Sequence, residues 1–153
     1  MTGLNSTAVI QAAIDHLVTT GLFESVQAHE ALSAPGNGLT ADVWTDSIKP
    51  TPAWSGLAES SAVLTLWARI YLNATGLPTD NLEQTIAAAT DALMTAYSAG
   101  FTFGGLVTVD LLGGLTGTAL SAQGGYVSVG GVAYRCMTIT IPCLLADVWP
   151  QAQ

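Results

Sequence analysis

The sequence has very few charged residues. Only 9% of its 153 residues are Asp, Glu, Lys or Arg, although half are hydrophobic. An average soluble domain carries about 25% charged residues. So large a deficit indicates a surface that partner molecules cover, as in a subunit of a larger assembly. The length predicts a single domain, residues 1–153, with a substantial core.

Basic residues are the scarcest of all. Lys49, Arg69 and Arg135 stand against 11 acidic residues, and the net charge is −8. Proteins bind nucleic acid largely by neutralising phosphates with Lys and Arg. Three scattered cations are too few for that, which excludes the nucleic-acid-binding class. The acidity still allows DNA to pass close to the protein without being held.

Long apolar runs are missing as well. The longest, AVLTLWARIYL (62–72), contains Arg69 and is shorter than the roughly 20 residues of a membrane-spanning helix. The N-terminal segment MTGLNSTAVIQAAIDHL has no basic start and carries Asp15, unlike a secretory signal peptide. We therefore expect that the protein does not associate with membranes. We also expect that it assembles in the cytoplasm.

The sequence offers no metal or disulfide site. Cys136 and Cys143 are seven residues apart in an extended run, an odd spacing that places them on opposite faces of a strand. We expect both to be reduced, as in a cytosolic protein. His16 and His29 have no partner at a metal-ligand spacing. No metal and no cofactor are therefore expected.

Catalytic motifs are also absent. The glycine pairs at 104–105, 113–114, 124–125 and 130–131 have neither the lysine nor the strand–loop–helix context of a phosphate loop, so they predict β-turns. Asp42 and Asp46 flank Trp44 on one predicted strand face, and a carboxylate pair can act as acid and base. A solvated outer strand face is the more common meaning of this pattern.

Hydrophobic periodicity predicts two helices. Residues 5–20 place apolar side chains at helical spacing, with Asn5 or Ser6 as the cap and Gly21 at the end. Residues 81–98 do the same, with Asp80 and Glu83 as a capping box.

The remaining segments predict strands. We expect 22–32 and 39–48 to form a hairpin around the turn cluster 34–38. The long strand 61–73 has one wholly apolar face, which should meet the core. Residues 106–112 predict a further strand.

The clearest local pattern is GYVSVGGVAYR (125–135). Gly130-Gly131 supplies the positive φ angles of a tight turn, with Val129 opposite Val132 and Tyr126 opposite Arg135. The order of helices and strands then predicts an α+β fold, in which one mainly antiparallel β-sheet carries two helices packed on one face. Five residues are the candidates for contact with a partner: Trp44, Trp54, Tyr126, Arg135 and Trp149.

Several segments of the chain together resemble a known family. The series GLFESVQAHE (21–30), LTADVW (39–44), IKP (48–50) and VLTLWARIY (63–71) is similar to the tail terminator, or tail completion, proteins of long-tailed phages. The closing segment GGYVSVGGVAYRCMTITIPCLLADVW (124–149) resembles the forms found in phages of actinobacteria. The resemblance covers nearly the whole chain in order, and its motifs are structural.

The resemblance implies a structural virion protein without enzymatic activity. Such proteins form a hexameric ring that caps the tail tube and joins it to the head. The implied partners are further copies of the chain, the tail tube protein and a head–tail connector or head-closure protein, and DNA passes through the ring without specific binding. The resemblance assigns no role to any single residue.

Three other functions stay open at this stage. The first is another phage neck protein, such as a head-closure protein. The second is a small α+β ligand-binding domain that dimerises through its apolar surface, although no convergent polar cluster marks a pocket. The third is a hydrolase that uses Asp42 and Asp46.

Overall fold

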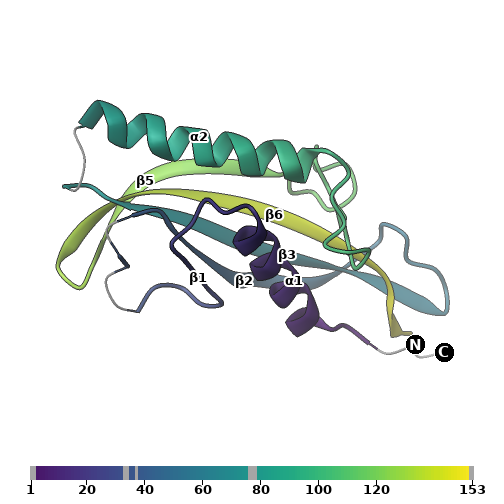
Figure 1. The fold of residues 1–153 in the computed structure, drawn as a ribbon. Coiled ribbons are helices and arrows are strands. Elements are labelled where there is room, and N and C mark those ends of the chain that lie inside the picture. Colours follow the sequence, from purple (N-terminus) through teal and green to yellow (C-terminus); the bar gives the residue numbers. More distant parts are fainter. Residues whose placement is uncertain (1–2, 33–34, 37, 76–78, 152–153) are drawn as a thin grey trace.

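The computed structural model describes residues 3–32, 35–36, 38–75 and 79–151. Its described part contains two helices and six strands (Figure 1). The helices are α1 (Ser6–Thr19) and α2 (Thr79–Ser98). The strands are β1 (Ser25–Gln27), β2 (Thr40–Thr51), β3 (Glu59–Asn73), β4 (Thr108–Val109), β5 (Ser121–Val129) and β6 (Val132–Pro150).

The strands form one sheet in the order β1-β2-β3-β6-β4, and β5 pairs with β6 beside β4. Every pair is antiparallel except β1 with β2. The predicted α+β fold with a mainly antiparallel sheet is therefore confirmed. The two long central strands, β3 and β6, carry most of the sheet and pair over nearly their whole length.

The core lies between the sheet and the two helices. One face of β3 from Ala62 to Ile70 is fully buried, as the spacing of its apolar residues predicts. These residues belong to one apolar cluster with residues of both helices, so α1 and α2 cover the same face of the sheet. The helix residues in that cluster are Val9, Ala13, Leu17, Ile86, Ala89, Leu93 and Tyr97. We call the opposite side the helix-free face.

The two helices begin differently from each other. The side chain of Asn5 accepts a hydrogen bond from the backbone N–H of Ala8, which makes Asn5 the predicted cap of α1. Helix α2 begins at Thr79 rather than residue 81, so Asp80 lies in its first turn and not at the cap. The predicted capping box is wrong, because the Glu83 carboxylate binds Arg135 of β6 instead. Neither helix in the described part is long and apolar enough to span a membrane.

The prediction of a hairpin between 22–32 and 39–48 is wrong. Strand β1 has only three residues and runs parallel to β2, with Ser25 beside Thr40. After β1 the chain moves onto the helix-free face, where Glu30 pairs with Arg69 and Ala31 packs on a tyrosine cluster. Because the chain passes over that face before it re-enters the sheet as β2, β2 runs in the same direction as β1. The predicted turn 34–38 lies partly outside the described residues.

The predicted 125–135 hairpin is confirmed. Val129 pairs with Val132, Tyr126 pairs with Arg135, and both turn glycines have positive φ. Strand β6 continues well past this hairpin, as far as Pro150. The predicted strand 106–112 shrinks to β4, because the chain turns at Asp110.

The cysteines lie on opposite faces of β6, as their spacing predicts. Cys136 belongs to a cluster with Tyr71 and Tyr134 on the helix-free face, whereas Cys143 is part of the helix-side core. Both are buried free thiols, and burial raises the pKa of the Cys143 thiol to about 12. Both therefore stay protonated and unreactive at neutral pH.

Candidate interface surfaces

The five predicted contact residues do not form one site. Trp54 and Tyr126 are well exposed, at 51% and 68% of their surface. Trp44 and Trp149 are half-buried, and Trp149 packs against the core cluster. Arg135 has only 12% of its side chain exposed. Trp54 follows β2, and Trp149 lies near the end of β6. Tyr126 and Arg135 lie near the β5–β6 turn, so the exposed candidates mark separate surfaces.

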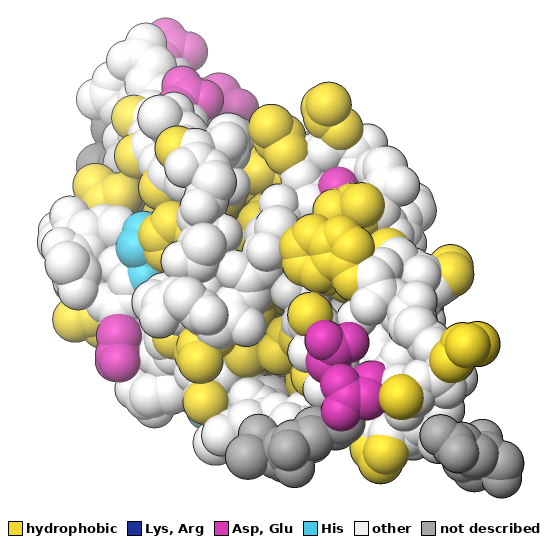
Figure 2. Space-filling model, turned by 90° about the vertical axis from the view of Figure 1, so that its right-hand side faces the viewer, with side chains coloured by type: hydrophobic (Ala, Val, Ile, Leu, Met, Phe, Trp, Pro, Cys, Tyr) yellow, Lys and Arg dark blue, Asp and Glu magenta, His cyan; other side chains and the backbone are white. Residues whose placement is uncertain are grey.

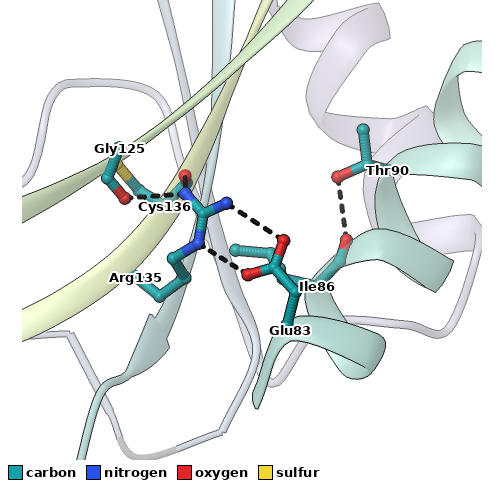
Figure 3. A network of polar contacts seen from close by, with 6 residues as sticks. All are labelled: Glu83, Ile86, Thr90, Gly125, Arg135 and Cys136. Atoms are coloured by element: carbon teal, nitrogen blue, oxygen red, sulfur yellow. Dashed lines mark hydrogen bonds and ion pairs between the residues drawn. The ribbon is translucent and has the colours of Figure 1, made fainter. Parts of the chain in front are cut away.

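The Arg135 side chain links three elements of the same chain (Figure 3). Its Nε and Nη2 donate to the two carboxylate oxygens of Glu83 on α2, at 3.0 and 3.1 Å. Its Nη1 donates to the carbonyl oxygens of Gly125 on β5 and Cys136 on β6, at 3.0 and 2.9 Å. These bonds to Glu83 hold the pKa of the Glu83 carboxyl below its usual range. Arg135 therefore fastens α2 to the β5–β6 ladder.

Gly124 makes room for this network. A Cβ atom at position 124 would lie 2.8 Å from both terminal nitrogens of Arg135, which is closer than non-bonded atoms approach. The Arg135 guanidinium also lies 5.3 Å from the centre of the Tyr126 ring, so the exposed tyrosine stacks on a fixed cation. The hairpin thus presents Tyr126 in a defined position.

A second arginine network lies on the helix-free face. Arg69 Nε donates to the Thr138 hydroxyl at 2.9 Å, and Nη1 pairs with the Glu30 carboxylate at 3.3 Å. The guanidinium also lies 5.2 Å from the centre of the Trp44 ring, and Trp44 packs edge-on against Trp67. Arg69 therefore holds the segment after β1 onto the sheet. Its guanidinium also covers part of the Trp44 ring, which is why Trp44 is half-buried.

Asp42 lies beside this network and is almost completely buried, with 3% of its surface exposed. Its Oδ2 atom has no hydrogen-bond partner among the described residues. Desolvation raises the pKa of the Asp42 carboxyl to about 6, although His29, Tyr71 and Arg69 act in the opposite direction. Its charge is thus poorly compensated at neutral pH.

The predicted acidic pair is not assembled. A β-bulge between Thr45 and Ser47 interrupts the alternation of β2. Asp46 is exposed at the bulge while Asp42 is buried before it, so the two carboxylates have opposite environments. Among the described residues no group of three or more His, Cys, Asp or Glu side chains has the geometry to hold a metal ion.

A shallow depression of about 270 Å³ opens on the helix-free face between these elements. Trp67 and Arg69 line it on β3, Thr138 and Thr140 on β6, and Gln123 on β5. Ligand sites commonly have volumes of about 300–1,000 Å³. The depression is therefore small for a ligand pocket, and sequence reasoning missed it because its lining comes from three separate strands.

Sequence reasoning also missed a compact loop at residues 110–120. The Asp110 carboxylate accepts hydrogen bonds from the backbone N–H groups of Gly113, Leu115 and Thr116 and from the Thr116 hydroxyl, at 2.7 to 3.0 Å. Burial opposes its charge, but these bonds hold the pKa of Asp110 below its usual range. The backbone N–H of Leu120 closes the loop on the Asp110 carbonyl oxygen. The signal was an Asp followed by glycines and Thr, which favours such side-chain-capped turns.

This loop and its neighbours carry most of the exposed apolar side chains. Six of the eleven large hydrophobic side chains that are exposed in the described part belong to residues 54–57 and 106–115. The two segments are linked, because the Thr51 hydroxyl donates to the Leu115 carbonyl oxygen at 3.4 Å. We call the six side chains together the end surface: Trp54, Leu57, Leu106, Leu111, Leu112 and Leu115.

Comparison with known proteins adds no further assignment, because neither a protein-family model nor a curated protein matches the chain.

Proposed function

We propose that this chain is a tail-terminator-like structural protein of a long-tailed phage. In this proposal six copies form a closed ring that caps the tail tube, joins it to the head connector or head-closure protein, and lets DNA pass through its channel. The protein assembles in the host cytoplasm, becomes part of the virion and catalyses no reaction. The observation that carries the proposal is a sheet with two different unpaired edges, one on each side.

The two edges belong to β5 and β2. Strand β5 pairs only with β6, and β2 beyond Asp42 pairs only with β3 in the described part of the chain. The edges have different sequences, so a contact between them joins unlike surfaces of two copies. Such head-to-tail contacts generate a ring when the rotation between copies closes. Paired edges are also protected from uncontrolled association.

The charge distribution supports passage of DNA without binding. Arg69 and Arg135 are each committed to an ion pair within the chain, with Glu30 and Glu83. Lys49 is the one basic side chain without an ion pair in the described residues. A net charge of −8 repels the phosphate backbone. Together with the series of segments that resembles the terminator family, this favours a channel-forming protein over a nucleic-acid-binding one.

The β5 edge gives a direct test. In a hairpin with a two-residue turn, Val129 and Val132 form a hydrogen-bonded pair, so the N–H of Ser128 points away from β6. Ser128→Pro removes that N–H and blocks addition of another strand, and proline is tolerated on an edge. Ser128→Ala is the matched control, because it changes the same exposed side chain and keeps the N–H.

The readout is the mass of the particle in solution by light scattering, with electron microscopy for its symmetry. The wild type and Ser128→Ala should give a ring of about 94 kDa, six times the 15.7 kDa of one chain. Ser128→Pro should give folded, smaller species. If the wild type is monomeric at high concentration and absent from purified virions, the proposed function is wrong. If Ser128→Pro still forms the ring, the β5 edge is not a contact between subunits.

Two alternatives keep separate tests. Another phage neck protein would form a similar ring, and antibody labelling of virions separates the two by the position of the label. The depression on the helix-free face favours a small ligand-binding domain, although it is small and only Arg69 among its lining residues is charged. A saturable change in Trp fluorescence with a small metabolite would favour that domain.

A further inference from the structure

The end surface lies at the end of the sheet that is farthest from the Gly130-Gly131 turn, on the right in Figure 1. This end faces the viewer in Figure 2, where hydrophobic side chains lie between polar and acidic ones. Leu57 and Leu112 have 96% and 86% of their surface exposed. Six large exposed apolar side chains gathered in two linked segments favour a contact surface.

The 110–120 loop presents its part of this surface in a fixed conformation. The Asp110 carboxylate ties together the backbone at Gly113, Leu115 and Thr116, and the Thr51 hydroxyl fixes the loop to the end of β2. A Cβ atom at Gly113 would lie 3.1 Å from the Ala119 backbone nitrogen, so the two halves of the loop are in close contact. A loop that is rigid before binding loses little conformational entropy when a partner binds.

Charge identifies the kind of partner. Glu59 begins β3 and Asp147 is exposed near the end of β6, so acidic groups border the end surface. No lysine or arginine of the described residues is visible on this side in Figure 2. A second copy of the chain is a poor match, because Arg69 and Arg135 are held in ion pairs and only Lys49 is left to meet these acids.

We propose that the end surface docks a different protein, one that presents Lys or Arg side chains around an apolar recess into which Leu112 fits. The inference goes beyond the proposed function, because the end surface consists of loop side chains next to the end of β2 and not of the open strand edges, and it holds whether or not the chain forms a ring. Buried leucine supplies contact area, and the basic rim supplies orientation and a faster encounter.

The test uses a displayed library of random short peptides, selected on the full-length protein. Leu112→Ser removes the central apolar contact, and Leu32→Ser is the matched control. Leu32 is equally exposed, at 87%, but follows Ala31, which packs near the other end of the sheet. Asp147→Asn removes one rim charge, and asparagine tolerates the positive φ of 54° at that position.

Selected peptides should combine Lys or Arg with a leucine or an aromatic residue. Their dissociation constants should rise about tenfold with Leu112→Ser, should rise by a smaller factor with Asp147→Asn, and should not change with Leu32→Ser. Binding should weaken as salt screens the rim charges.

Three results would overturn the inference: peptides without basic residues, peptides that bind Leu112→Ser as tightly as the wild type, or no enrichment at all. A fourth is a loss of self-association in Leu112→Ser but not in Leu32→Ser, because the occupant would then be a second copy. The proposed ring is tested separately by the mass of the wild-type particle, so either idea can fail alone.

Discussion

Replacing Asp42 with asparagine should stabilise this protein at neutral pH. The Asp42 side chain is almost fully buried, and its Oδ2 lacks a hydrogen-bond partner in the described structure. Desolvation raises the pKa of its carboxyl from 3.8 to about 6. The folded state therefore prefers the protonated acid, which asparagine resembles in shape and in its lack of charge.

The sign and size of the effect follow from linkage. Because the folded pKa lies above the unfolded value, the wild type is most stable below about pH 4 with respect to this group, and that stability is lost as the pH rises to about 6. The difference between 3.8 and about 6 corresponds to at most about 3 kcal/mol. We expect Asp42→Asn to raise the free energy of unfolding by about 1–3 kcal/mol at pH 8 and to leave it nearly unchanged near pH 4.

Urea unfolding followed by Trp fluorescence, at several pH values and one fixed protein concentration, measures the effect. Fixed concentration matters, because any self-association adds to the apparent stability. Asp46→Asn is the control, since Asp46 is exposed on the same strand and should change stability by less than about 0.5 kcal/mol. If Asp42→Asn is instead less stable than the wild type at pH 8, attraction to Arg69 outweighs desolvation and the argument fails.

Three further predictions concern the hairpin and the charge of the surface. Gly124→Ala should lower the free energy of unfolding by about 1 kcal/mol relative to Gly114→Ala, because its Cβ displaces the Arg135 guanidinium, whereas a Cβ at Gly114 meets no atom within 4 Å; equal urea midpoints would contradict this. Tyr126→Ser should leave the unfolding midpoint of the chain almost unchanged and shift the ring toward smaller species in light scattering, and an unchanged mass distribution would exclude Tyr126 from the interface. The pure protein should not shift duplex DNA in a gel at physiological salt. A tight, salt-sensitive shift would refute the proposal that DNA passes the acidic protein without being bound.

Local patterns predicted the parts of this fold that local interactions determine. The 125–135 hairpin follows from its glycine pair and alternating residues, and the buried face of β3 follows from a period of two. The direction of β1 could not be predicted in this way. It depends on the path between β1 and β2, which the Glu30–Arg69 pair fixes across 39 positions of sequence.

The candidate site was less predictable than the fold for the same reason. Arg135 was expected at an interface, but its partner Glu83 is 52 residues away on a helix, and only the packing of α2 brings the two together. Trp54 and Tyr126, two of the predicted contact residues, are exposed. Contact of Trp54 or Tyr126 with a neighbouring subunit stays a prediction. The Asp110 loop did carry a local signal, an acidic residue followed by glycines and Thr, and could have been found.

The positions of the two arginines connect the fold with the proposed function. A protein with so little charge uses both arginines for internal fastening: Arg69 holds the segment after β1, and Arg135 holds α2. Each arginine bonds to several groups from different elements, which its planar fork of donors allows and a lysine would not. The same use removes positive charge from the surface and leaves it acidic and apolar. If the proposed function holds, internal stability and the expected weak affinity for DNA have one physical origin. A substitution that frees either arginine should then weaken the fold and increase nonspecific binding of DNA together.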